Sequence, residues 1–208
     1  MLIKICGVQS VEIAKAVEAS GADYMGFVFA PSRRFIKPEQ ASRISREVKH
    51  VCKVGVFVDE QPQVVHEIAM MCNLDFIQLH GNESLDYAKQ MQYPVIKAFR
   101  YTRDLPIVTL LQYPAQMILM DTYQCGVVGG TGKQFDWQEA QEKLRQLSVP
   151  LFVAGGIHQG NVDQMMHFLR PQGIDVSGGV EVNGVKSAEK IYEFVRTAHE
   201  AERRLSEC

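Results

Sequence analysis

Short apolar runs alternate with longer amphipathic segments along the chain. The short runs predict strands at Leu2–Ile5, Tyr24–Phe29, Val51–Val58, Phe76–Leu79, Val95–Phe99, Met117–Met120, Leu151–Val153 and Ile174–Ser177. Apolar residues at helical spacing predict helices at Val11–Ala19, Pro38–Val48, Pro62–Met71, Ser84–Met91, Leu105–Leu111, Trp137–Leu147, Val162–Leu169 and Ala188–Leu205. The pattern therefore predicts eight consecutive strand–helix units.

Regular alternation of strands and helices is typical of α/β proteins with a parallel sheet. The predicted strands are almost continuously apolar, as expected when both faces of the sheet are covered. Eight units of similar length favour closure into a (β/α)8 barrel, the TIM barrel, over an open doubly wound sheet. No linker or low-complexity stretch divides the sequence, so we predict one catalytic domain over residues 1–208.

The composition narrows the class of protein further. Of 208 residues, 46% are hydrophobic and 22% are charged, and the net charge of -2 is well distributed, which argues against a nucleic-acid partner. No apolar run of about 18 residues is present, and the first residues fit a strand better than a signal peptide. The five cysteines show no metal-ligand spacing and suit free thiols in a reducing compartment. We therefore expect a cytoplasmic protein without a membrane partner, and a monomer, because no long apolar surface stripe is evident.

In such barrels the active site lies at the carboxyl ends of the strands, here called the mouth. Two glycine pairs, Gly155-Gly156 and Gly178-Gly179, follow the seventh and eighth predicted strands. Backbone N–H groups in glycine turns at this place bind phosphate in many barrels. A single pair would be explained as well by a tight turn, but two adjacent pairs favour a phosphate site that includes Gly155, Gly156, Ser177 and Gly178.

Two residues with chemically useful side chains end the first and sixth strands. Cys6 lies on the same strand face as Lys4 and is either a partly exposed thiol at the mouth or a small buried hydrophobe. Asp121 ends an apolar strand and is either a cap or a functional acid whose pKa burial would raise. Lying on opposite walls, the two would suit a reaction that deprotonates one substrate atom and protonates another.

Three further residues at the strand ends are candidates for binding. Arg34, in a basic loop, would pair with a carboxylate in two-point geometry or lie on a solvated surface. For His80 we favour a binding or structural role over catalysis. Asp175 lies on the eighth strand, next to the first strand in a closed barrel, and we predict that it pairs with Lys4.

The glycine-rich segment 128–137 superficially resembles a P-loop. It lacks the required spacing, because Gln134 follows Lys133 where that motif has Ser or Thr. We interpret the segment as a loop over the mouth, in which Lys133 would cover a phosphate or carboxylate, or else as a plain connector. Asp136 lies where the sixth helix is expected to begin.

Several of these strand ends together resemble one family, the phosphoribosylanthranilate isomerases. The similar segments are Lys4–Gly7, Gly26–Phe29 with Ser32–Arg34, Gln78–Gly81, Leu119–Thr122, Gly129–Lys133 with Phe135–Trp137, Ala154–Ile157 and Asp175–Ser177. Each motif is short, but they occur in order over essentially the whole chain.

The resemblance implies an aldose–ketose isomerase of tryptophan biosynthesis (EC 5.3.1.24). Its reaction is the Amadori rearrangement of N-(5-phosphoribosyl)anthranilate to 1-(2-carboxyphenylamino)-1-deoxyribulose 5-phosphate. By the family's pattern, Cys6 would be the general base, Asp121 the general acid and Arg34 the ligand of the anthranilate carboxylate. His80, Lys133 and Asp175 would complete the substrate site, and the resemblance implies no metal or organic cofactor.

One departure from the family and two alternatives remain at this point. The family usually has a second Ser where this chain has Gly178, so one phosphate hydrogen bond is expected to be missing. The alternatives are another phosphate-binding barrel isomerase or epimerase, and a non-catalytic barrel that binds a phosphorylated ligand. An epimerase would call for metal ligands or paired acids, whereas a binding protein would need neither Cys6 nor Asp121.

Overall fold

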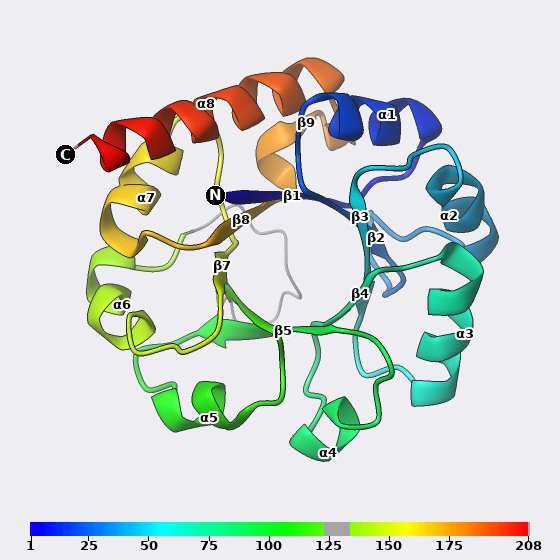
Figure 1. Cartoon of the computed structure of the whole chain (residues 1–208), viewed down its shortest axis with the longest axis horizontal. Coiled ribbons are helices and arrows are strands. Elements are labelled where there is room, and N and C mark those ends of the chain that lie inside the picture. The colour runs from blue at the N-terminus through cyan, green and yellow to red at the C-terminus, as the bar shows by residue number, and fades with distance from the viewer. Residues whose placement is uncertain (123–133, 208) are drawn as a thin grey trace.

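The computed structural model describes residues 1–122 and 134–207, and eight parallel strands in it close into a barrel (Figure 1). The strands are β1 (Leu2–Cys6), β2 (Tyr24–Val28), β3 (Cys52–Phe57), β4 (Phe76–Leu79), β5 (Val95–Tyr101), β6 (Met117–Thr122), β7 (Leu151–Val153) and β8 (Gly173–Val176). Neighbours in sequence are neighbours in space, and β8 pairs with β1 to close the ring, with Lys4 opposite Asp175. The predicted (β/α)8 fold is confirmed.

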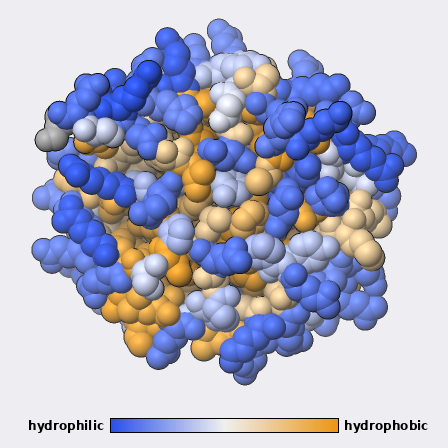
Figure 2. Space-filling model, viewed as in Figure 1, coloured by the Kyte–Doolittle hydropathy of each residue, from blue (hydrophilic) through white to orange (hydrophobic). Residues whose placement is uncertain are grey.

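In the described residues, eight α-helices surround the barrel and cover the outer face of the sheet (Figure 1). They are α1 (Val11–Ala19), α2 (Pro38–Ser45), α3 (Pro62–Cys72), α4 (Leu85–Ala88), α5 (Ile107–Gln112), α6 (Trp137–Leu144), α7 (Val162–Leu169) and α8 (Ala188–Ser206). Asp136 accepts a hydrogen bond from the Glu139 N–H at 2.9 Å, which confirms it as the cap of α6. The hydrophobic surface visible in Figure 2 includes the region of α5, where Val108 and Leu111 are exposed.

Some predicted boundaries were wrong for local reasons. Helix α4 is four residues long, and the turn after it is tightened by bonds to the third residue back, such as Met91 N–H to Ala88 C=O. Strand β6 continues to Thr122, because Asp121 and Thr122 pair with β5. The sequence analysis also missed the 3-10 helix η1 (Gly178–Val180) and the hairpin of β9 (Glu181–Val182) and β10 (Val185–Lys186).

The inward-facing side chains divide the barrel interior into two parts. At the end away from the mouth, the Tyr24 ring meets Phe76 and Phe152 edge-on, with centroids 5.6 and 5.8 Å away. This aromatic floor closes the interior, and Gly173 leaves room for it, since a Cβ there would lie 2.4 Å from the Phe152 ring. Nearer the mouth the inward positions are polar. The floor therefore supplies packing, and the upper positions are available for chemistry.

Candidate active site

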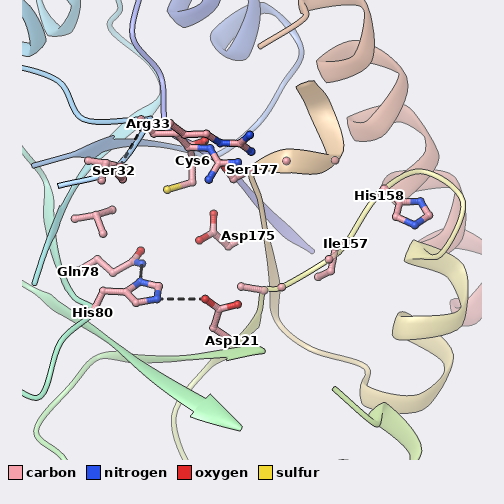
Figure 3. Close-up of a pocket in the computed structure, with 18 of the residues that line it drawn as sticks. Cys6, Ser32, Arg33, Gln78, His80, Asp121, Ile157, His158, Asp175 and Ser177 are labelled. Atoms are coloured by element: carbon pink, nitrogen blue, oxygen red, sulfur yellow. Dashed lines mark hydrogen bonds and ion pairs between the residues drawn. The ribbon is translucent and has the colours of Figure 1, made fainter. Parts of the chain in front are cut away.

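A cavity of about 690 Å³ opens at the mouth of the barrel (Figure 3). Its lining includes nine of the ten predicted site residues: Cys6, Arg34, His80, Asp121, Gly155, Gly156, Asp175, Ser177 and Gly178. The tenth, Lys133, lies outside the described residues. The predicted site therefore comes together as one pocket, on side chains from β1, β4, β6 and β8 and the loops that follow the strands.

Cys6, at the end of β1, lies beside a buried ion pair. The Lys4 ammonium donates to both carboxylate oxygens of Asp175 at 3.0 Å, which confirms the predicted pairing. A Cβ on Gly26 would lie 2.9 Å from Cys6 Sγ and 3.1 Å from Lys4 Nζ, so the thiol and the ammonium share the space above this glycine. Burial raises the pKa of the Cys6 thiol, and the attraction of the Lys4 cation opposes that rise.

Asp121 lies across the mouth from Cys6, at the end of β6 (Figure 3). Its Oδ1 accepts the backbone N–H of Thr122 at 2.7 Å, and its Oδ2 lies 3.2 Å from Nε2 of His80. Asp121 is buried, so it meets the requirement for an acid shielded from bulk water.

Gln78 fixes the orientation of His80, and the sequence analysis did not single it out as a site residue. Its side-chain amide lies 2.8 Å from Nδ1 of His80 (Figure 3). With the amide nitrogen assigned as the donor, Nδ1 accepts, and the ring proton is on Nε2, which donates to Asp121. Gln78 is on β4 and His80 directly follows that strand, so the two residues, two positions apart, extend to the same side. The sequence did contain this signal.

Arg34 is held in place by a carboxylate that sequence reasoning missed. Its Nε and Nη2 donate to the two oxygens of Glu181 at 2.7 and 3.1 Å. Glu181 also accepts from Arg33 Nη2 at 2.8 Å and from Lys186 Nζ at 2.5 Å. Three cations thus converge on one buried anion, which leaves an excess of positive charge at this side of the mouth. Such a surplus favours anionic ligands.

The sequence did contain a signal for this cluster, the Asn-Gly pair at 183–184, which predicts a tight hairpin turn. Both residues have positive φ, at 51° and 81°, as the two-residue turn of a tight hairpin requires. The turn folds β10 back onto β9 and brings Lys186 to Glu181. Lys186 Nζ also donates to the backbone carbonyl and the hydroxyl of Ser177 at 3.2 Å.

The two glycine turns lie against each other. A Cβ on Gly179 would come within 2.1 Å of the Ile157 carbonyl oxygen, so only glycine permits this contact. Gly155, at a φ of 85°, packs against β6: a Cβ there would lie 2.1 Å from Thr122 Oγ1 and 2.7 Å from Asp121 Oδ1. By contrast, Gly178 faces open space, with Arg34 Nη2 3.6 Å from the place of its Cβ. The turns therefore form one continuous backbone surface beside the acid.

Another buried ion pair, Lys97–Glu83, lies on the opposite wall of the barrel. Lys97 on β5 donates to Glu83 at 2.6 Å and to the Gly81 carbonyl at 2.7 Å.

Among residues 1–122 and 134–207, no group of His, Cys, Asp and Glu is arranged to hold a metal ion. In the same residues, no helix has the length and apolar character needed to cross a bilayer.

Comparison with known proteins identifies the family. A sequence model described as N-(5'-phosphoribosyl)anthranilate isomerase matches residues 3–197. A relative of that name from Desulforudis audaxviator is 43% identical, over 96% of this chain and 98% of its own length. The chain belongs to the N-(5'-phosphoribosyl)anthranilate isomerase family.

Solved structures of phosphoribosylanthranilate isomerases agree with this assignment. The structure from Thermus thermophilus has a TM-score of 0.87 at 36% identity, covering 96% of this chain and 99% of that one. The structure from Thermotoga maritima has a TM-score of 0.88 at 36% identity, with the same coverage. Another isomerase structure, with a TM-score of 0.85 at 35% identity and the same coverage, contains reduced 1-(o-carboxyphenylamino)-1-deoxyribulose 5-phosphate.

Membership of the N-(5'-phosphoribosyl)anthranilate isomerase family confirms the predicted activity. The chain is an isomerase of tryptophan biosynthesis that carries out an Amadori rearrangement. A phosphorylated small molecule is the kind of ligand found in the related complex.

Proposed function

We propose that Cys6 is the general base and Asp121 the general acid of the Amadori rearrangement. The supporting observation is their placement, because a thiol and a carboxylate face one cavity from opposite walls. Lys4 is the cation that acts on Cys6, and His80 hydrogen-bonds to Asp121. A reaction that needs a proton delivered at one atom and removed at another requires two such groups.

The steps assign each proton and electron pair. Asp121, protonated in the substrate complex, gives its proton to the furanose ring oxygen as the C1–O bond breaks. The nitrogen lone pair then forms an iminium, and His80 together with the Thr122 N–H stabilises the carboxylate left behind. The Cys6 thiolate removes the C2 proton, and the C–H electrons move into a C1–C2 double bond as the iminium becomes an amine. The resulting enolamine exchanges protons with water: it takes one at C1 and releases that of the C2 hydroxyl, which gives the ketone. Before the next turnover the Cys6 thiol loses a proton to water and the Asp121 carboxylate regains one.

Binding follows from the charges around the mouth. The backbone of Gly155, Gly156, Ser177 and Gly178 would hold the phosphate, whose charge suits exposed N–H groups. Arg34 would hold the anthranilate carboxylate. Its hydrogen bonds to Glu181 use Nε and Nη2, and within the described residues Nη1 remains available for a ligand. His80 and Asp175 line the space between these ends. Lys133, which lies outside the described residues, would cover the bound substrate.

We propose that residues 1–208 form one catalytic domain that acts in the cytoplasm as a monomer. The exposed large hydrophobic side chains of the described residues support a monomer, because they are spread over several elements. A relative from Thermotoga maritima is described as dimeric. Light scattering during gel filtration distinguishes the two states, and a dimer would overturn this part.

Substitution of the two groups tests the mechanism. Cys6→Ser and Asp121→Asn are each expected to lower kcat by at least about 100-fold, the usual contribution of a general acid or base. The decay of anthranilate fluorescence on mixing with substrate measures turnover. Binding of the reduced product analogue is expected to persist in both variants.

Cys52→Ser is the matched control. Cys52 is another half-buried thiol on the barrel, on β3, but it packs against the hydrophobic cluster that includes the aromatic floor. This variant is expected to turn over like the parent enzyme. Near-normal turnover by Cys6→Ser or Asp121→Asn would show that the role proposed for that residue is wrong.

A further inference from the structure

The arrangement of Lys4 goes beyond what a structural ion pair requires. Its side chain is fully buried inside the barrel, on the strand face that two residues later carries Cys6. An ammonium group has three N–H donors, and two are used by the Asp175 oxygens at 3.0 Å each. The third N–H is not used by Asp175, and the Cys6 thiol lies with Nζ above Gly26.

We propose that Lys4 is a positioning residue for the catalytic base: its ammonium group supplies the positive charge against which the Cys6 thiolate forms, and Asp175 holds that ammonium group in place. The inference deepens the proposed function, because it depends on Cys6 acting as the base. A thiol buried beside a carboxylate would otherwise remain protonated, and a thiol cannot remove the C2 proton.

The surroundings of Cys6 support this assignment. The charged groups that act on it are Lys4 on its own strand, Asp175 on β8 and Lys186 on β10, while β2 contributes Gly26. Burial alone would lower the pKa of Lys4, but Asp175 and Cys6 raise it above its usual range, so the amine stays charged at neutral pH. Asp175 has the opposite effect on the thiol and raises its pKa.

The two members of the ion pair therefore have opposite effects on Cys6, and this gives the test. The pKa of the thiol is measured from the pH dependence of Cys6 alkylation by iodoacetamide, with the Cys6 peptide quantified by mass spectrometry. Lys4→Met is expected to raise that pKa by at least about one unit, the usual effect of losing a close opposite charge. Asp175→Asn removes the negative charge but keeps an amide oxygen that can accept from Lys4, so the ammonium group stays in place and the thiol pKa is expected to fall. In Lys4→Met, the rise of kcat with pH should move to higher pH by the same amount.

Two further variants separate charge from folding. Lys97→Met removes the buried lysine of the Lys97–Glu83 ion pair, on the opposite wall, and is expected to leave the Cys6 pKa unchanged. Lys4→Arg keeps the charge and is expected to hold the thiol pKa within about half a unit of the parent, below the one-unit shift expected on loss of the charge. If Lys4→Met does not fold, Lys4→Gln replaces it, since an amide can still donate to Asp175.

Equal pKa values in Lys4→Met or Lys4→Gln and the parent would overturn the proposal, as would shifts of the same sign in the Lys4 and Asp175 variants. The alkylation measurement does not depend on turnover. If Cys6→Ser kept its activity, the proposed base would be wrong, while the effect of Lys4 on the thiol would still be measured separately.

Discussion

Glu181 offers the sharpest test of how the mouth is held together. Its carboxylate accepts hydrogen bonds from Arg33, Arg34 and Lys186, and Glu181→Gln would remove the only charge that opposes theirs in this cluster of described side chains. The exposed fractions of the Glu181, Lys186 and Arg34 side chains are 5%, 5% and 12%, whereas that of Arg33 is 55%. The loss therefore falls mainly on the two buried pairs.

The size of the effect follows from this burial. Breaking a buried ion pair by removing one partner costs about 3–5 kcal/mol, while an exposed partner such as Arg33 adds at most about 1 kcal/mol. Because glutamine keeps one acceptor oxygen, we expect the lower end of this range, a loss of about 3 kcal/mol in the free energy of unfolding. Denaturant titration measures it. Because Arg34 would lose its support, KM is expected to rise more than kcat falls.

The same residue predicts how stability depends on pH. Burial would raise the pKa of Glu181, but hydrogen bonds from Arg34 and Lys186 outweigh it, so the folded-state pKa is lowered. A lowered carboxyl pKa contributes stability that is complete above the unfolded pKa of about 4.3 and is lost as pH falls through the folded value. Glu181→Gln should therefore lose less stability than the parent on acidification through this range.

Glu139→Gln is the control, because Glu139 also pairs with an arginine, Arg103, but on the surface. Its unfolding midpoint should stay close to that of the parent. A Glu181→Gln variant within about 1 kcal/mol of the parent would refute the reasoning, since it would mean that the cluster behaves like a surface salt bridge.

Two glycines of the phosphate turns give opposite predictions. Gly155→Ala places a Cβ against Asp121 and Thr122 at a positive φ. It should therefore destabilise the fold by at least about 1 kcal/mol and lower kcat. Thermal unfolding and turnover measure the two effects, and an unchanged kcat would contradict the contact with Asp121. Gly178→Ser has room for its side chain and adds a hydroxyl beside the phosphate turn, so KM should fall with kcat unchanged. An unchanged KM in steady-state assays would show that the backbone alone serves the phosphate.

The barrel could be predicted because its signal is repeated. Each apolar run and each amphipathic segment is weak alone, but eight in succession leave few topologies, and closure then determines which strands are neighbours. The Lys4–Asp175 pairing followed directly from that closure. The positions of Cys6 and Asp121 at the ends of the first and sixth strands likewise made them candidates for the mouth.

What could not be predicted depends on contacts between distant segments. Glu181 supports Arg34 from 147 positions away, and no local pattern links the two residues. Gln78 looked like an ordinary strand residue until the geometry placed its amide on His80. The end of α4 depended on a choice between two hydrogen-bond spacings that differ little in energy and leave no clear mark in the sequence.

The aromatic floor of Tyr24, Phe76 and Phe152 also has a consequence for how this protein can change over evolutionary time. The floor packs one end of the barrel with side chains that do not line the cavity. Substitutions at the strand ends can therefore alter which molecule is bound, while the packing that tolerates their destabilising effects stays intact. Such a division lets new specificities arise by few mutations, each of which leaves the protein folded.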